Sequence, residues 1–296
     1  MKSLLTALQS GKVLISDGAW GTFLHERGLE PGECPELWNI TRREDVLAIA
    51  QSYVDAGADM ILTNSFGGSP FKLEHFGLAD RTAELNEAAA AISREAAGPD
   101  RFVLGSIGPT GVMLMMGQVS ENELYEGFKI QAGALKKGGA DAIVVETMSA
   151  LDEAACAVRA AKDAAGLEVV VTFTFEKTAS GDFRTMMGVS PADMAKAMKE
   201  AGASIIGTNC GNGFENMIGI VEEIRKVDAV TPVLVHANAG KPVYQDGVTI
   251  FPETPEEMAG RTAALVKSGA NIIGGCCGTG PAHIRAIAEA VRQLEF

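Results

Sequence analysis

Apolar residues gather in short runs along the chain, and longer stretches with helical spacing separate these runs. Eight such runs can be recognised: KVLIS, ADMILT, RFVLGS, DAIVVE, LEVVVTFTF, ASIIGT, TPVLVHA and ANIIGG. They are apolar throughout rather than strictly alternating, which is typical of parallel strands that are covered on both faces. The pattern therefore predicts eight buried strands.

The stretches between the runs predict crossover helices. Examples are REDVLAIAQSYVDAGAD and PADMAKAMKEAGAS, and several of them end in a small residue and a glycine, a common helix C-terminal signal. The phrases AGAD, GGAD, AGAS and SGAN precede the second, fourth, sixth and eighth predicted strands.

Eight strand and helix pairs in a chain of 296 residues predict an α/β protein with a single (β/α)8 TIM barrel. No linker-like Pro/Ser run divides the chain, so we expect one domain over residues 1–296. A doubly wound open sheet is the alternative. The chain has no glycine-rich nucleotide-binding motif at the first strand–helix turn, which disfavours that alternative.

Charge and cysteine content narrow the partners and the compartment. The formal net charge of −13 opposes binding to nucleic acid or to an anionic membrane, so we expect small-molecule or protein partners. The five cysteines are odd in number and widely scattered, which indicates a reducing compartment. The N-terminal apolar stretch is too short for a signal peptide, and we expect a cytoplasmic protein.

Polar and thiol side chains stand where the predicted strands end. In chain order they are Asp17, Thr63, Asn64, Ser106, Glu146, Glu176, Asn209, Cys210, His236, Asn238, Cys276 and Cys277. Barrel enzymes hold their catalytic groups at this end of the strands. Cys210 can therefore meet Cys276 and Cys277 at one rim, and three converging thiolates predict a zinc site with one position open to substrate.

The two other cysteines are poor candidates for a fourth ligand. Cys34 lies in the loop EPGECPELWN, and we expect it to pack within that loop. Cys156 lies in the predicted helix LDEAACAVRAAKDA, where a free cysteine commonly serves as a small buried apolar residue.

Seven strand-end motifs together are characteristic of a known family. They are DGAWGT, TNSFGGS, GPTG, VET, GTNCG, NAG and GGCCGTGP, in this order and over nearly the whole chain. Through them the sequence resembles the zinc-dependent homocysteine S-methyltransferases. The resemblance implies that Cys210, Cys276 and Cys277 bind zinc at the C-terminal face of the strands and that homocysteine occupies the open position.

The same resemblance implies a substrate pocket. Glu146 would hold the amino group of homocysteine, and Asp17, Asn64 and Ser106 would line the pocket. Asn238 would offer a neutral oxygen to the open zinc position before homocysteine arrives, although a turn-forming asparagine would explain it nearly as well. No side chain is expected to act as an acid or a base, because the zinc-bound thiolate of the substrate is itself the nucleophile.

The methyl donor stays open at this stage. The segments DGAWGT, ECPELWN and NSFGG are similar to the homocysteine module of cobalamin-dependent methionine synthases. We therefore expect methylcobalamin or another methylcorrinoid as donor, carried by a separate corrinoid protein. An excised module of a longer enzyme, or a self-sufficient enzyme that uses S-methylmethionine or betaine, are the alternatives, and a non-catalytic zinc-binding barrel is the alternative of another class.

Three further features allow two interpretations each. The Met-rich loop GVMLMMG could offer a docking surface to the corrinoid protein, but local packing is the more common role of such residues. Trp20 could cover the substrate pocket or pack at the barrel mouth. For His236 we expect a structural, hydrogen-bonded histidine rather than an acid–base group.

Overall fold

A single sheet of eight parallel strands forms the centre of the protein, for which a computed structural model describes residues 3–9, 11–245 and 247–294. The strand order is β1-β12-β9-β8-β5-β4-β3-β2. The strands are β1 (Leu14–Ile15), β2 (Met60–Leu62), β3 (Phe102–Ile107), β4 (Ala142–Met148), β5 (Glu168–Phe173), β8 (Ile205–Asn209), β9 (Val233–Ala237) and β12 (Ile272–Gly275). Each predicted apolar run overlaps one of them, and β3, β4 and β8 extend one or two residues further, so the prediction of eight strands is confirmed.

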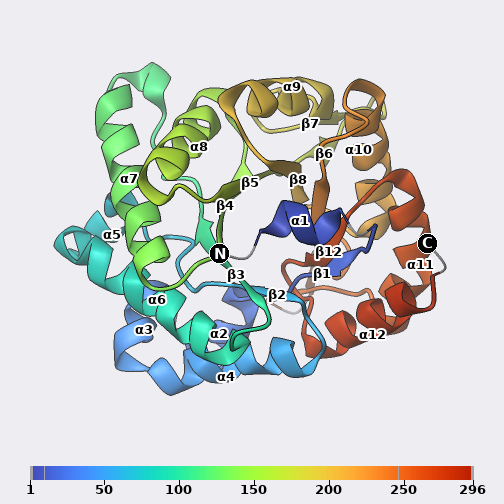
Figure 1. Cartoon of the computed structure of the whole chain (residues 1–296), viewed down its shortest axis with the longest axis horizontal. Coiled ribbons are helices and arrows are strands. Elements are labelled where there is room, and N and C mark those ends of the chain that lie inside the picture. Colours follow the sequence, from blue (N-terminus) through green and yellow to red (C-terminus); the bar gives the residue numbers. More distant parts are fainter. Residues whose placement is uncertain (1–2, 10, 246, 295–296) are drawn as a thin grey trace.

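Helices surround this sheet on its outer side (Figure 1). The helices that follow the eight strands are α4 (Arg43–Asp55), α6 (Thr82–Ala97), α7 (Glu121–Lys137), α8 (Leu151–Ala165), α9 (Pro191–Ala201), α10 (Phe214–Val227), α11 (Pro255–Ser268) and α12 (Pro281–Arg292). Local sequence fixes several of their ends, as where the side chains of Ser120 and Thr254 each accept a hydrogen bond in a capping box. The predicted (β/α)8 barrel is therefore confirmed.

Two aspartates close the barrel where β1 meets β2. Asp59 donates its backbone N–H to Ile15 O at 2.7 Å, and its carboxylate accepts the N–H of Ile15 at 2.8 Å. Further along, the Asp17 carboxylate accepts the N–H of Leu62 at 2.7 Å. Side chains thus supply hydrogen bonds at the junction between the first and last strands of the sheet order.

The arrangement at Asp59 recurs before other strands and explains the repeated GAD and GAN phrases. Asp141 donates its N–H to Val103 O and accepts the N–H of Val103 on its carboxylate, at 2.8 and 2.9 Å. Asn271 makes the same pair of bonds with Val233, also at 2.8 and 2.9 Å. In each case the residue before a strand holds the start of the preceding strand.

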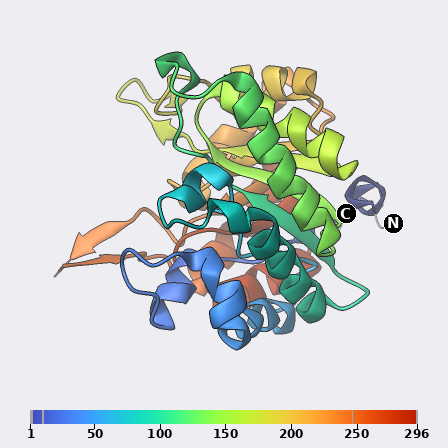
Figure 2. The ribbon, with the colours of Figure 1, turned by 90° about the vertical axis from the view of Figure 1, so that its left-hand side faces the viewer.

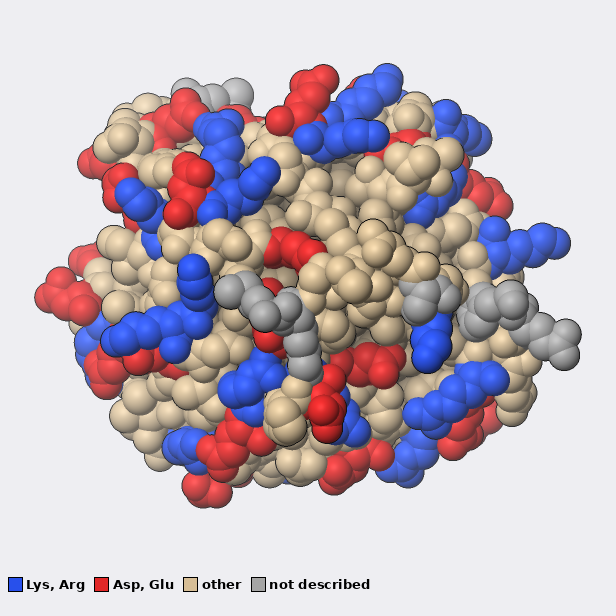
Figure 3. All heavy atoms as spheres, viewed as in Figure 1, with Lys and Arg blue, Asp and Glu red and all other residues tan. Residues whose placement is uncertain are grey.

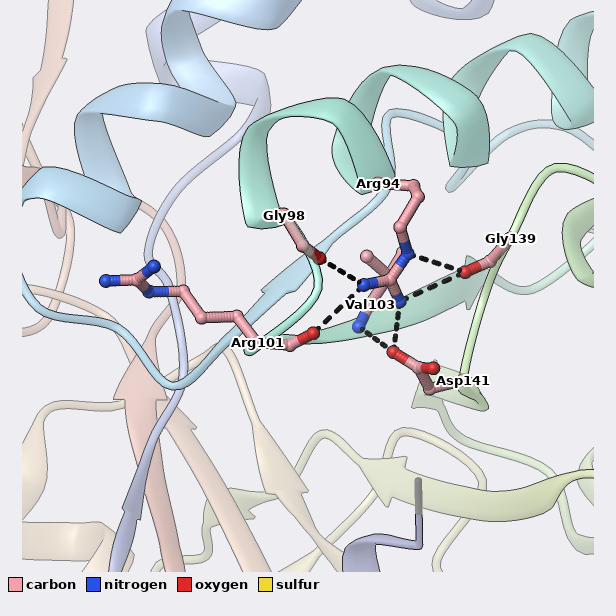
Figure 4. Close-up of polar contacts among 6 residues, drawn as sticks. All are labelled: Arg94, Gly98, Arg101, Val103, Gly139 and Asp141. Carbon is pink, nitrogen blue, oxygen red and sulfur yellow. Dashed lines mark hydrogen bonds and ion pairs between the residues drawn. The ribbon is translucent and has the colours of Figure 1, made fainter. Parts of the chain in front are cut away.

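An arginine completes this arrangement in two places. Arg94 donates to the carbonyls of Gly98, Arg101 and Gly139 and pairs with Asp141 (Figure 4). Arg225 likewise donates to three backbone carbonyls and to the side chain of Asn271. Both arginines fasten a helix end to the starts of two strands, at the N-terminal end of the barrel.

The barrel interior is apolar at its N-terminal end. Helix α1 (Leu4–Leu8) lies across this end (Figures 1 and 2), and Leu4 is buried against the inward residues of the strands. Those residues include Leu14, Met60, Leu104, Val170, Ile205, Leu234 and Ile272. The backbone N–H of Leu4 and the hydroxyl of Ser3 both donate to Glu168, each at 2.6 Å, which holds the helix in place.

Loops with short elements of their own lie at the other end. They carry α2 (Gly21–Glu26), η1 (Pro35–Leu37), α3 (Trp38–Thr41), α5 (Pro70–Glu74), η2 (Ala79–Arg81) and η3 (Leu114–Met116). They also carry two antiparallel pairs, β6 (Glu176–Lys177) with β7 (Phe183–Arg184) and β10 (Val243–Gln245) with β11 (Val248–Ile250). Figure 2 shows the β10–β11 hairpin projecting from the barrel on the side opposite α1.

Charged side chains of both signs are interspersed around the periphery of the face that carries α1 (Figure 3). The described residues on this face form no broad positive patch of the kind that binds a polyanion. Within the described part of the chain, every helix is too short or too polar to cross a lipid bilayer.

Candidate metal and substrate site

Three sulfur atoms meet at the C-terminal end of the barrel. Cys210 follows β8, and Cys276 and Cys277 follow β12, and their Sγ atoms all lie within 4.8 Å of one another. The three side chains are half-buried, so the cluster is open to one side. Separation of this order fits three thiolates around a single zinc ion.

Backbone hydrogen bonds from β9, which runs between β8 and β12, hold the cysteines. Cys210 donates its N–H to His236 O at 2.9 Å, and Cys276 donates its N–H to Ala237 O at 2.6 Å. Cys277 O in turn accepts the N–H of Ala239 at 3.0 Å. The cluster therefore depends on the three strands keeping their register.

Close packing explains the glycines that precede the paired cysteines. A Cβ on Gly274 would stand 2.9 Å from the ring of His236 and 2.7 Å from Asp17 O. A Cβ on Gly275 would stand 2.1 Å from the side chain of Thr279. Any larger residue at these positions would push β12 away from its neighbours and shift the thiols.

Hydrogen bonds between the three thiols shift their pKa values. The S–H groups of Cys276 and Cys277 donate toward Cys210, and these bonds lower the pKa of the Cys210 thiol to about 3. The same interaction with Cys210 raises the pKa of Cys277 to about 12 and that of Cys276 well above its usual range. A cation bound by all three sulfurs would instead stabilise three thiolates.

Asn238 lies next to this cluster. Its side chain is 2% exposed and hydrogen-bonds to Cys210, which contributes to the lowered pKa of that thiol. Its Oδ1 has no hydrogen-bond partner among the described residues. A buried oxygen without a partner, beside three sulfurs, is suited to a metal ion as an additional neutral ligand.

Two buried carboxyl groups line the same end of the barrel interior. Asp17 accepts the indole N–H of Trp20 at 2.8 Å as well as the N–H of Leu62, and burial raises the pKa of Asp17 to about 7. The indole of Trp20 is thus fixed at the barrel mouth.

Glu146, near the end of β4, is the second carboxyl group. The hydroxyl of Ser106 donates to it, which joins two of the predicted pocket residues. Burial raises the pKa of Glu146 to about 7, and the negative charges of Asp17 and Cys210 add to the shift. A buried carboxylate with this environment gains by binding a cation such as an ammonium group.

Asn64 follows β2, and its side chain is hydrogen-bonded to the loop that follows β1. Its side-chain amide donates to Pro35 O at 2.8 Å and to the Asn39 side chain at 3.1 Å. Glu36 of the same loop is buried and accepts the N–H of Gly67 at 2.7 Å, and burial raises its pKa. The sequence motifs did not single out Glu36, although an acidic residue flanked by Cys34 and Trp38 offered a weak signal.

His236 lies in the barrel interior with 2% exposure. Burial lowers the pKa of this side chain to about 3, so the imidazole is neutral at physiological pH. Its Nε2 lacks a partner among the described residues, so the expectation of a hydrogen-bonded histidine is wrong for this atom. The ring lies so close to Gly274 that a Cβ there would stand 2.9 Å from it, so the imidazole is packed against β12.

The remaining expectations concern residues away from the thiols. Cys34 and Cys156 are buried and separate from the three clustered sulfurs. Met113 and Met116 of the Met-rich loop are 50% and 64% exposed, and Glu176 is exposed in β6.

Asn209 is buried at the end of β8, directly before Cys210, and its side chain makes three hydrogen bonds. The sequence showed that Asn209 ends a strand, but it did not show these bonds.

The described residues thus form a (β/α)8 barrel whose C-terminal face carries two buried carboxyl groups and three clustered thiols that could hold a metal ion. The chain belongs to the homocysteine S-methyltransferase family, whose model matches residues 14–291. The resemblance inferred from the strand-end motifs is therefore confirmed.

Relatives of known name agree with this membership. The chain is 34% identical to methionine synthase of Mycobacterium tuberculosis, over 97% of this chain and 25% of that protein. It is also 34% identical to methionine synthase of Mycobacterium leprae, over 95% of this chain and 24% of that protein. The chain thus spans about a quarter of the length of these relatives.

Solved structures share the fold. The metallated form of the homocysteine methyltransferase MmuM from Escherichia coli superposes with a TM-score of 0.79 at 23% identity, covering 97% of this chain and 99% of that one. A methyltransferase from Methanosarcina mazei superposes with a TM-score of 0.61 at 14% identity, covering 98% of this chain and 97% of that one. At these identities the likeness supports the barrel fold.

Proposed function

We propose that this protein transfers a methyl group to the thiol of homocysteine and so forms methionine. The observation that carries the proposal is the convergence of three cysteine sulfurs within 4.8 Å, beside a buried carboxyl group, in a member of this family. Methionine synthase is also the printed name of the mycobacterial relatives.

The residues present fit a zinc ion. Cys210, Cys276 and Cys277 would hold it, and the unpartnered oxygen of Asn238 would serve as a neutral ligand that homocysteine can displace. Bound zinc would lower the pKa of the homocysteine thiol, so that the substrate reacts as a thiolate at neutral pH.

The chain itself would position the substrate. Glu146 would accept hydrogen bonds from the ammonium group, while the hydroxyl of Ser106 keeps the carboxylate in place. Asp17 would add negative charge to the ammonium pocket, and Trp20 and Asn64 would hold the walls around it. Because the four polar side chains are buried and Trp20 is partly buried, the site would restrict water and strengthen each polar contact.

Methyl transfer then needs no acid or base from the protein. An electron pair on the substrate sulfur forms the new S–C bond, and the donor keeps the electron pair of the bond that breaks. His236 has a pKa of about 3, so at neutral pH it is not an imidazolium and cannot serve as a general acid. Methionine is a neutral thioether and lacks the negative charge with which the homocysteine thiolate would be attracted to zinc, so the product would be released more readily.

A methylcorrinoid such as methylcobalamin is the proposed donor, delivered by a separate corrinoid protein. The segments DGAWGT, ECPELWN and NSFGG, which are similar to the homocysteine module of cobalamin-dependent methionine synthases, support a corrinoid more than a betaine donor. Betaine carries a quaternary ammonium, which proteins commonly surround with aromatic rings. The three tyrosines do not gather into such a cage. Tyr53 lies near the site but donates its hydroxyl to Ala19 O and Thr279 O, Tyr125 donates to Asp163 on the outer helices, and Tyr244 lies in the projecting hairpin.

The test is methionine formation by zinc-loaded protein given homocysteine and, in parallel, methylcobalamin, S-methylmethionine or betaine. Turnover with methylcobalamin supports the proposal. Turnover with S-methylmethionine or betaine alone would replace the proposed donor by a small sulfonium or quaternary ammonium. A lack of methionine with every donor would contradict the proposed function.

The cytoplasm, as expected from the free cysteines, is the proposed location.

A further inference from the structure

The strand that carries Glu146 is irregular at that residue. In the pairing of β4 with β5, Val145 is opposite Val171 but Met148 is opposite Phe173, so β4 contains one extra residue. Glu146 and Thr147 lie within this bulge. Bulges of this kind redirect a side chain and are frequent beside active sites.

The bulge requires a strained backbone. Thr147 has a φ of 62°, in the left-handed region that β-branched residues seldom adopt. Such a conformation persists only where surrounding contacts hold it. The identity of those contacts therefore determines where Glu146 stands.

The side-chain hydrogen bonds to Thr147 come from one residue two strands away. Asn209, at the end of β8, accepts the N–H of Thr147 at 2.9 Å and donates to the hydroxyl of Thr147 at 2.7 Å. Its Oδ1 also accepts the hydroxyl of Thr172 on the intervening strand β5 at 2.8 Å. Asn209 is fully buried, so water does not replace these bonds readily.

The same residue precedes a thiol of the cluster. Cys210 follows Asn209 directly and has a φ of 60°, also in the left-handed region. The backbone carbonyl of Asn209 accepts the hydroxyl of Thr174 at 2.9 Å, which fixes the turn into Cys210. One asparagine thus connects the position of Glu146 to the position of Cys210.

We infer that Asn209 is a positioning residue that sets the distance between Glu146 and the thiol cluster, and thereby the length of aminothiol that the site accepts. The inference rests on the proposed function, in which Glu146 holds the ammonium group and the metal site holds the sulfur. Homocysteine has one more methylene between these groups than cysteine. A fixed separation therefore favours homocysteine by about 10- to 200-fold, the range expected for one methylene.

The experiment measures binding without turnover. Cobalt(II) is loaded in place of zinc, and the absorption bands of cobalt report the arrival of a further thiolate when homocysteine or cysteine is titrated. In Asn209→Ala, we expect the homocysteine Kd to rise tenfold or more and the preference over cysteine to fall toward one. Cobalt stoichiometry stays at the wild-type value, because the three cysteines remain.

Two further variants make the result specific. Thr147→Val removes the hydroxyl that accepts from Asn209, keeps the shape of the side chain, and should reduce the preference in the same direction to a smaller extent. Asn271→Ala is the matched control. The Asn271 side chain likewise accepts a backbone N–H, that of Val233, and it accepts a hydrogen bond from Arg225 at the N-terminal end of the barrel, so its loss should lower stability and leave the preference unchanged.

The failure of this inference can be told apart from the failure of the proposed function. If the wild-type cobalt spectrum responds to homocysteine but Asn209→Ala keeps the wild-type preference, the positioning role is wrong. An equal loss of preference in Asn271→Ala would also overturn it. A wild-type spectrum that does not respond to homocysteine would overturn the proposed function and this inference with it.

Discussion

Glu146 is the residue on which substrate affinity should depend most directly. In Glu146→Gln we expect the homocysteine KM to rise about 10- to 100-fold, because the ion pair between the carboxylate and the ammonium group is replaced by a hydrogen bond from the ammonium group to an uncharged amide. Zinc content should stay unchanged, since the three cysteines are intact. Steady-state kinetics and metal analysis check this, with the exposed Glu176→Gln as the control. Loss of zinc instead of affinity would mean that Glu146 supports the metal site.

Asp17 should reveal its burial through the pH dependence of stability. Its pKa in the folded protein is about 7, above the ordinary value of 3.8, so the folded state retains a proton that the unfolded state has lost between these values. The Asp17 carboxyl therefore lowers the free energy of unfolding progressively as pH rises from 4 to 7. An asparagine in place of Asp17 does not ionise, so it contributes no such dependence on pH.

The stability of Asp17→Asn relative to wild type should thus improve between pH 5 and pH 8, by on the order of 2 kcal/mol. Urea denaturation of both proteins at the two pH values measures this difference. Asp100→Asn, at an exposed position, should show no such change relative to wild type. Parallel pH dependences of Asp17→Asn and wild type would show that Asp17 is ionised throughout the range.

Strands determine the metal site, because no single segment contains all of its ligands. β8 brings Cys210 and β12 brings Cys276 and Cys277, and β9 lies between them in the sheet. In the sheet, Asn209 pairs with His236 and Gly275 pairs with Ala237. This register determines where along the barrel axis the cysteines that follow β8 and β12 lie. A change in the register of β9 would therefore separate the thiols without altering a ligand.

Replacement of any one cluster cysteine by serine should reduce zinc content by tenfold or more at equal free zinc, because a soft thiolate ligand is lost. Cys156→Ala, which removes a buried thiol in α8, should retain zinc.

X-ray absorption at the zinc edge should count three sulfur ligands without homocysteine and four with it. Four sulfurs before homocysteine is added, with no change afterwards, would indicate a closed structural site instead.

The whole barrel divides into a face for stability and a face for chemistry. The Arg94 and Arg225 networks lie at the N-terminal end of the strands, opposite the thiols. If the two ends have these separate roles, Arg94→Ala should lower the free energy of unfolding by about 2 kcal/mol, because charge-assisted hydrogen bonds are lost. The homocysteine KM should not change.

Arg94→Lys should recover little of the stability, because an ammonium group does not reproduce the planar fork that reaches several carbonyls at once. Arg285→Ala, at an exposed position of α12, is the control. Urea denaturation and steady-state kinetics measure both effects. A raised KM in Arg94→Ala would show that the two ends of the barrel are coupled.

The sequence by itself determined the barrel and the members of the thiol cluster. Continuous apolar runs are distinctive of strands covered on both faces, and the order of strand ends placed Cys210 on the same rim as Cys276 and Cys277. The pairing of Ser106 with Glu146 is consistent with the predicted pocket, because both residues end adjacent strands.

The tertiary structure alone decided how these residues are held. The β4 bulge, the left-handed backbone of Thr147 and the reach of Asn209 across β5 depend on contacts between segments far apart in the chain. Burial likewise shifts the pKa values of Asp17 and His236 in opposite directions, because it disfavours the charged form of each. Local sequence does not encode burial or register, so strand-end positions could be predicted while their geometry and charge could not.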